Sequence, residues 1–235
     1  PYSAATKTPD HAPPSDTNEP YPMVPRSPPN TKHPTRHFAT ATHRWFLDRA
    51  VGEGIPLTAA GYLKPADVVA ACEVVPAMAE WIGENNREVN AAPLLNFRES
   101  LQSMGLLRKY KGRLLLTRAG AAAQRSPEVL WDHLAGRLSP PDKDGFDTPA
   151  TLLLLLFAAT SAQAELPCDR IASALSELGW RRSDGRPLRG YDIYSLRAFD
   201  ALDNIGDTAG HRRRKPISAA AAALARAALC PSRRG

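Results

Sequence analysis

Cysteine is scarce in this chain, and no two cysteines stand close enough in sequence to form a metal-binding or redox pair. The three are Cys72, Cys168 and Cys230, and no CxxC motif occurs. Their odd number and wide spacing support neither a zinc ribbon nor a disulfide framework. We therefore expect the three cysteines to be small buried or tail residues of a protein in a reducing cytoplasm. The first residues also lack the basic start and apolar run of a signal peptide.

Long apolar runs and catalytic motifs are missing as well. Residues 152–159 are uninterruptedly apolar, but a membrane span needs about 20 residues, so this run predicts a core helix and no membrane partner. No GxSxG, P-loop, HExxH, GxGxxG or paired-carboxylate motif is present. His33, His37 and His43 cluster loosely, but two of them lie in a proline-rich tail that cannot fix metal-ligand geometry. We therefore expect no enzyme, no cofactor and no metal site.

Acidic residues are missing from the C-terminal end, where no Asp or Glu follows Asp207. The whole chain carries a formal net charge of +6, and the segment after Asp207 contributes +7, so the preceding residues sum to −1. We expect this end to attract polyanions at long range. The cations that follow Asp207 are Arg212, Arg213, Arg214, Lys215, Arg226, Arg233 and Arg234.

Proline marks the N-terminal segment, since residues 1–36 hold ten of the 22 prolines. A chain with so much proline and no apolar periodicity is typical of a disordered or linker segment. A second stretch rich in Pro, Asp and Gly predicts a linker between two folded units. The expected organisation is a disordered segment 1–38, a first unit 39–138, a linker 139–148, a second unit 149–230 and a basic tail 231–235.

One arrangement of elements occurs twice, in residues 105–123 and in residues 205–229. Each copy follows an amphipathic helix and reads as a strand, a basic turn, a second strand and a Thr or Ser that starts an Ala-rich helix. Winged-helix domains are built in this way, with the helix in a nucleic-acid groove and the wing on phosphates. We expect a mainly α fold with small β-hairpins, made of tandem winged-helix (helix-turn-helix) units.

The helix before the first hairpin is expected in residues 90–104, with Asn90 as its N-cap. One face presents Gln102, with Arg98 on its flank, and both residue types read base edges. A solvated face without a ligand explains the same pattern. The opposite, apolar face is expected to be buried and consists of Leu94, Phe97, Leu101 and Met104.

In the second unit the corresponding helix, residues 191–205, is expected to turn Tyr194, Arg197 and Ala201 outward. Tyr194 and Arg197 are therefore the candidates for base contacts there. Three aspartates make this helix net acidic, which is unfavourable in a groove.

The two basic turns carry the candidate phosphate contacts, because Lys and Arg at a hairpin tip reach the backbone of a nucleic acid. For the first turn, a soluble turn whose cations discourage edge pairing is an alternative. For the second, the alternative is a flexible basic loop without a defined partner. The candidates are Arg108, Lys109, Lys111 and Arg113 in the first turn and Arg212, Arg213, Arg214 and Lys215 in the second.

Three stretches carry a specific likeness: LTAAGYL at 57–63, GLLRKYKGRLLLT at 105–117 and LWDHLAGRL at 130–138. Through them, residues 45–229 resemble the C-terminal module of actinobacterial plasmid ORF-3-like proteins of the Ri-plasmid type, also described as insertion-sequence passenger proteins of the TnpR type. The resemblance implies carriage on plasmids or mobile elements, in a family without an established activity. An ORF-3-like domain commonly precedes this module, and residues 1–36 do not have its composition. No nucleophile-bearing motif supports a recombinase.

Two wings at matched positions lead us to expect a cytoplasmic protein that binds nucleic acid, duplex DNA in particular, in the context of mobile elements. The alternative is a winged-helix module for contact with a partner protein or for homodimerisation. In that case Leu95 and Ala201, which are expected to be apolar and outward on their helices, help to form the interface.

Overall fold

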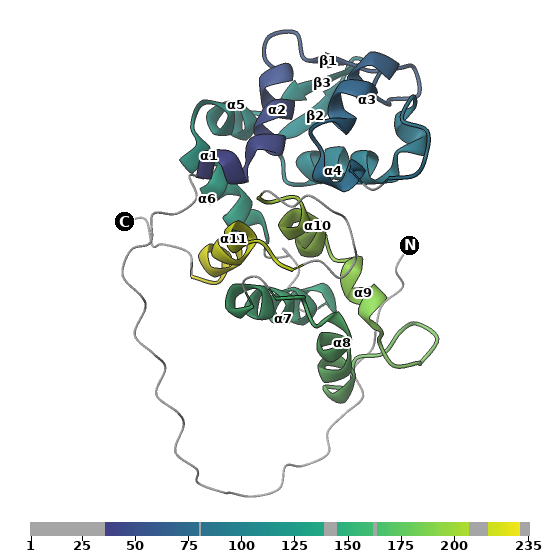
Figure 1. Ribbon diagram of the computed structural model, residues 1–235, viewed down its shortest axis with the longest axis vertical. Helices are drawn as coiled ribbons and strands as arrows, with labels where there is room; N and C mark the ends of the chain where they lie inside the picture. The colour runs from purple at the N-terminus through teal and green to yellow at the C-terminus, as the bar shows by residue number, and fades with distance from the viewer. Residues whose placement is uncertain (1–35, 80, 139–144, 162–163, 207–215, 231–235) are drawn as a thin grey trace, which may run out of the picture.

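The computed structural model describes residues 36–79, 81–138, 145–161, 164–206 and 216–230. Within these ranges the protein is mainly helical and has one small antiparallel sheet of three strands, which confirms the predicted combination of α-helices with a small β component. In Figure 1 the elements form two halves, one above the other: an upper half from α1 to α6 and a lower half from α7 to α11.

After a short first helix, the upper half follows the order helix, strand, helix, helix, strand, strand, and then ends in two helices. Its elements are α1 (Arg36–Ala39), α2 (Ala41–Arg49), β1 (Ile55–Pro56), α3 (Pro65–Cys72), α4 (Ala92–Ser103), β2 (Leu107–Tyr110), β3 (Arg113–Leu116), α5 (Arg118–Arg125) and α6 (Pro127–Leu138), with the 3-10 turns η1 (Pro76–Met78) and η2 (Glu88–Asn90) between α3 and α4. The strand order is β1-β3-β2, so a strand that precedes α3 pairs with one that follows α4.

A tight turn joins β2 to β3. Tyr110 pairs with Arg113, which leaves a loop of only Lys111 and Gly112. Their φ angles are 46° and 70°. Two successive residues with positive φ form a type I′ turn, whose twist matches that of the strands, and glycine adopts this backbone without strain. The hairpin predicted here is confirmed.

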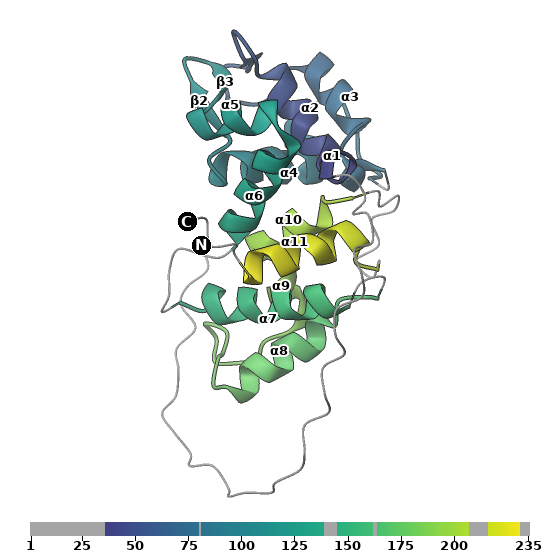
Figure 2. The same cartoon turned by 90° about the vertical axis from the view of Figure 1, so that its left-hand side faces the viewer.

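The described elements of the lower half are all helices: α7 (Asp147–Thr160), α8 (Cys168–Glu177), α9 (Gly190–Tyr194), α10 (Arg197–Asp203) and α11 (Ala219–Leu229). Helix α11 packs against α7 and α6, and α10 packs against α4 (Figures 1 and 2). The Gly206 amide also donates to the Ala39 carbonyl at 3.1 Å. Buried residues of both halves therefore belong to one continuous hydrophobic core.

The apolar run 152–159 lies within α7, where Leu154 and Leu155 are fully buried in this core. No helix in the described ranges is long and apolar enough to cross a lipid bilayer.

The caps of α5 and α11 repeat one set of contacts. The Thr117 hydroxyl accepts a hydrogen bond from the Gly120 amide at 2.9 Å and donates to the Gly105 carbonyl at 2.6 Å. The Ser218 hydroxyl accepts from the Ala221 amide at 2.9 Å and donates to the Ile205 carbonyl at 2.7 Å. In both halves the N-cap thus ties an Ala-rich helix to the end of the preceding helical segment.

Several boundaries differ from the expected ones. Residues 36–38, expected to be disordered, belong to α1, and the last two linker residues, 147 and 148, belong to α7. Asn90 is not the N-cap of α4, because η2 includes it and Ala91 takes the capping position. The single helix expected for 191–205 is broken into α9 and α10, because Leu196 has an extended backbone, with φ −69° and ψ 135°.

The second hairpin falls mainly on residues 207–215, which lie outside the described ranges, as do residues 1–35 and 231–235. Beside that segment, Pro216 forms an isolated antiparallel bridge with Glu165.

We predict that Thr117→Ala and Ser218→Ala each lower the free energy of unfolding by about 1 kcal/mol, because each removes the acceptor of an N-terminal helix amide. Urea denaturation measures this, and Ser173→Ala on the exposed side of α8 serves as the control. A change no larger than that of the control would show that the caps do not stabilise the helices.

Candidate nucleic-acid interface

The β2–β3 hairpin presents a cluster of cations around one tyrosine. Arg108, Lys109 and Lys111 are exposed, and Tyr110 is 48% exposed. The Arg108 guanidinium carbon lies 5.1 Å from the centroid of the Tyr110 ring, and the Lys111 ammonium lies 5.4 Å from it. These are cation–π distances, so the ring holds two cations at the surface of a rigid turn.

Arg113, the fourth cation of the predicted wing, has a structural partner. Its Nη2 lies 3.0 Å from Glu53 Oε2 and donates to the Gly54 carbonyl at 3.3 Å, and its Nε donates to the Glu53 carbonyl. It therefore fastens the loop before β1 to β3. Together with Glu53 the hairpin keeps a local charge of +3, from Arg108, Lys109 and Lys111.

Lys109 extends toward the turn that follows β1. A Cβ placed on Gly61 would lie 3.4 Å from Lys109 Nζ, an ordinary contact distance, so the ammonium group lies beside this turn. The hairpin is held to the same loop by the Leu57 amide, which donates to the Gly112 carbonyl at 2.8 Å. The exposed Lys64 lies beyond this turn, at the start of α3.

Arg98 does not belong to the surface. Its side chain is 0% exposed, and its Nε lies 2.5 Å from Glu88 Oε1. The other Glu88 oxygen accepts a hydrogen bond from the Leu63 amide at 2.7 Å. The expectation that Arg98 contacts a base is therefore wrong. A signal was present in the sequence, because Arg98 shares the helical face of Leu94 and Leu101 at spacings i, i+4 and i+7.

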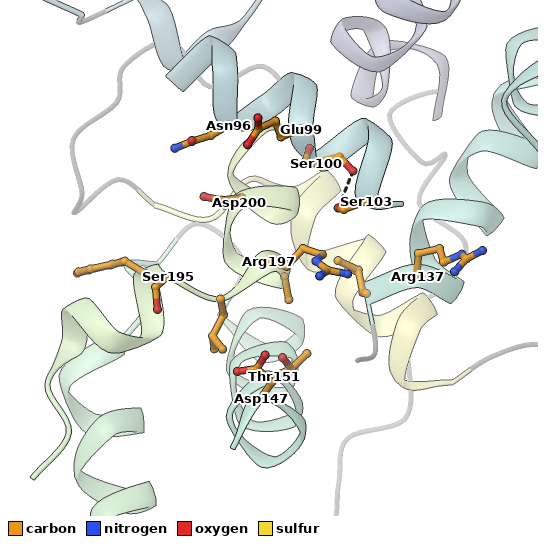
Figure 3. A pocket seen from close by; sticks show the side chains of 14 residues that line it. Asn96, Glu99, Ser100, Ser103, Arg137, Asp147, Thr151, Ser195, Arg197 and Asp200 are labelled. Carbon is orange, nitrogen blue, oxygen red and sulfur yellow. Dashed lines mark hydrogen bonds between the residues drawn. The ribbon is translucent and has the colours of Figure 1, made fainter. Parts of the chain in front are cut away.

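The polar face of α4 looks toward the lower half. A cleft of about 600 Å³ separates it from α10. In Figure 3, Glu99 and Ser103 of α4 lie across this cleft from Arg197 and Asp200 of α10. Gln102 of α4 is half-buried and does not line the cleft, although it was expected on an open surface. The face that was expected to read bases thus forms one wall of a cleft and α10 forms the facing wall, while Asn96, Glu99 and Ser103 remain exposed.

The three outward residues predicted for the second unit have different environments. Arg197 is exposed at the rim of the cleft. Tyr194 is half-buried, and its ring packs edge-on against Phe199 with centroids 5.0 Å apart. Ala201 is only 3% exposed, so its proposed place in an interface is wrong. The break between α9 and α10 rotates the second helix and turns Ala201 into the core.

Two ionisable groups, the half-buried Asp200 and the fully buried His43, have strongly shifted pKa values. Burial raises the pKa of the Asp200 carboxyl from 3.8 to about 6, and the carboxylate of Asp203 contributes to the rise. Burial lowers the pKa of the His43 imidazole from 6.5 to about 4. The His43 ring packs edge-on against Phe97, with centroids 5.0 Å apart. Because the ring nitrogens have no hydrogen-bond partner among the described residues, nothing offsets the cost of charging them.

Arg212, Arg213, Arg214 and Lys215 lie outside the described residues. Among the residues that are described, no group of three or more His, Cys, Asp or Glu side chains is placed to hold a metal ion. Comparison with protein-family models, curated proteins and solved structures finds no match to this chain. The family resemblance inferred from the sequence therefore stays a prediction.

We expect Arg98→Met to lower the free energy of unfolding by about 3–5 kcal/mol, because it leaves the Glu88 carboxylate buried without a counter-charge. The double variant Glu88→Gln, Arg98→Met should be more stable than Arg98→Met alone. The side-chain amide oxygen that it introduces still accepts the hydrogen bond from the Leu63 backbone amide and carries no charge. Chemical denaturation measures both, with exposed Arg87→Met as the control. A double variant that is less stable than Arg98→Met would contradict this account.

The two shifted pKa values oppose each other in their effect on stability. Folded Asp200 binds its proton more tightly than in the unfolded chain, so its contribution to stability rises as the pH falls from about 6 to 4. Folded His43 binds its proton more weakly, so its contribution is lost as the pH falls from 6.5 to about 4.

Asp200→Asn should remove only the first contribution. When the pH is lowered from 6.5 to 4.5, the free energy of unfolding of Asp200→Asn should decrease by about 1 to 2 kcal/mol more than that of the unsubstituted protein. Denaturation curves across this range measure the difference, and Glu177→Gln on the exposed side of α8 is the control. Parallel pH profiles for Asp200→Asn and the unsubstituted protein would show that Asp200 titrates normally.

Proposed function

We propose that this protein binds duplex DNA and that the β2–β3 hairpin contacts the phosphate backbone. The observation that supports this most is the group of exposed cations on a tight turn, with Arg108 and Lys111 held against the ring of Tyr110. A preorganised turn loses little conformational entropy when it binds, and cations at its tip meet phosphates without competing carboxylates.

We also propose that the upper half is a winged-helix unit. The order α2, β1, α3, α4, β2, β3, with strands arranged β1-β3-β2, supports this assignment. In such a unit α4 occupies the position of the recognition helix and the β2–β3 hairpin is the wing. The lower half repeats the contacts of the capping residue, which supports a common origin of the two halves.

The wing is the part of this unit that we assign to DNA. Helix α4 packs against α10, and its polar side chains line the cleft between the two halves. Helix α10 stands opposite these exposed side chains and would obstruct a duplex there, whereas the hairpin lies at the open surface. Contacts to phosphate without contacts to base edges position a protein but carry no sequence information. The proposed binding therefore depends on charge and shape and does not depend on base sequence.

The association with plasmids or mobile elements and the cytoplasmic location follow from the sequence alone, and both stay predictions. The alternative function, contact with a partner protein, was expected to use Leu95 and Ala201. It is weakened by the burial of Ala201, and Leu95 is itself half-buried.

The test uses the triple variant Arg108→Ala, Lys109→Ala, Lys111→Ala, which removes the three hairpin charges. Each phosphate neutralised by the protein adds about 0.9 to the slope of log affinity against log salt. We expect the triple variant to bind a duplex more weakly at low salt and its salt slope to be smaller by about 2.7. Fluorescence anisotropy with a labelled duplex, titrated at several salt concentrations, measures both quantities.

The matched control is Arg87→Ala, Arg125→Ala, Arg170→Ala, which removes the same charge from three other exposed positions. If both triple variants lose affinity equally, net charge alone explains binding and the hairpin has no special role. If the unsubstituted protein binds no duplex at low salt, the proposed function is wrong.

A further inference from the structure

A second cationic turn joins α8 to α9 in the lower half. Four arginines lie within nine residues of this segment, against a single aspartate, Asp184: they are Arg181, Arg182, Arg186 and Arg189. Hydrogen bonds fix the turn. The Arg182 amide donates to the Arg186 carbonyl at 3.0 Å, the Gly185 amide donates to the Arg182 carbonyl at 2.8 Å, and the Arg186 amide donates to Asp184 Oδ1 at 3.0 Å. This is an ordered turn, comparable in that respect to the β2–β3 hairpin.

The base of the turn is attached to α8. The Leu188 amide donates to the Ser176 hydroxyl at 2.9 Å. Arg181 donates to the Ser176 carbonyl, and to the Trp180 carbonyl at 2.9 Å, so it serves the C-terminal end of α8. A side chain with these partners has a structural role. The arginines that remain for a ligand are Arg182, Arg186 and Arg189.

The outer part of the turn repeats the combination found on the hairpin, an exposed tyrosine with an arginine over its ring. The Arg182 guanidinium carbon lies 5.0 Å from the centroid of Tyr191, and Tyr191 is 40% exposed. The Arg186 side chain is 70% exposed, and Arg189 is exposed as well. Two separate parts of the chain therefore present arginine against tyrosine at the surface.

Nearby carboxylates only partly balance this charge. Arg182 lies 3.8 Å from Asp192 and 3.9 Å from Asp184, and Arg186 lies 3.9 Å from Asp184. The two pairs with Asp184 are exposed and contribute little, whereas the Asp192 side chain is only 8% exposed and holds part of the Arg182 charge. Asp184 is also engaged by the backbone amide of Arg186, which together with the nearby arginines lowers the pKa of its carboxyl. From Arg181 to Asp192 the four arginines and two aspartates sum to +2. Asp169, whose Oδ1 accepts a hydrogen bond from the Gly190 amide at 3.0 Å, reduces the local charge to +1.

The two cationic turns belong to one body. The contacts of α10 with α4 and of α11 with α6 join the halves that carry them. In Figure 2, β2 and β3 lie at the left of the upper half, and the end of α8 that leads into the second turn lies at the left of the lower half. A long polyanion along this side of the molecule would meet both turns.

We propose that the α8–α9 turn is a second phosphate-binding element for the same duplex, with Arg182, Arg186 and Arg189 as its contacts. This inference rests on the proposed function, since it assigns a second point of attachment to the ligand of the hairpin. Two attachment points on one body raise the affinity for any ligand long enough to reach both, because the second contact forms at high effective concentration. Affinity should therefore depend on duplex length.

The test compares Arg186→Ala, Arg189→Ala with Arg87→Ala, Arg170→Ala, which removes the same charge from exposed positions outside both turns. Duplexes from about 8 to about 40 base pairs, of one base composition, are titrated by anisotropy at several salt concentrations, and circular dichroism checks that each variant is folded. On the longest duplex we expect Arg186→Ala, Arg189→Ala to bind about tenfold more weakly than the control, with a salt slope smaller by about 1.8. On the shortest duplex that binds, this difference should shrink.

Each outcome decides one of the two proposals. If the hairpin variant loses affinity while Arg186→Ala, Arg189→Ala equals its control on every duplex, the second element is wrong and the proposed function stands. The same holds if the loss is equal on short and long duplexes, because the turn then does not act as a distant second contact. If the unsubstituted protein binds no duplex of any length, both proposals are wrong.

Discussion

The buried ion pair between Arg98 and Glu88 determines how this protein presents its surfaces. It joins α4 to η2 and, through the amide of Leu63, to the loop before α3. A buried charged pair is stable only when its geometry is fixed, so the pair holds α4 in one rotational setting. In that setting its apolar side faces the core and its polar side faces α10. The hairpin that follows α4 then remains at the surface, and the proposed contact with a polyanion falls on the hairpin.

Local pattern was sufficient to predict α4, the β2–β3 hairpin and the Ala-rich helix α5. The spacing of Leu94, Phe97 and Leu101 identified the buried face of α4, and the Lys111-Gly112 pair identified the hairpin turn. Both signals are local, because helical periodicity and turn chemistry depend on residues close in sequence. The Thr and Ser that start α5 and α11 were identified for the same reason.

Contacts between distant segments were not predictable in this way. Arg98 was placed on the surface because its partner, Glu88, lies in a turn that the pattern of α4 does not reveal. The break at Leu196 was missed because the residues on either side continue a helical pattern, and this break moves Ala201 into the core. The position of α10 opposite α4 was missed because it depends on how the two halves pack, which no short window of sequence contains.

The hydrogen bond from Gly206 to Ala39 crosses from one half to the other, and α11 packs against α6. The two halves are therefore joined by direct contacts into one body. A fragment cut between α6 and α7 would expose the side of α6 that packs against α11 to water. Neither piece would keep a complete hydrophobic core. We therefore expect the described residues to unfold in a single cooperative transition.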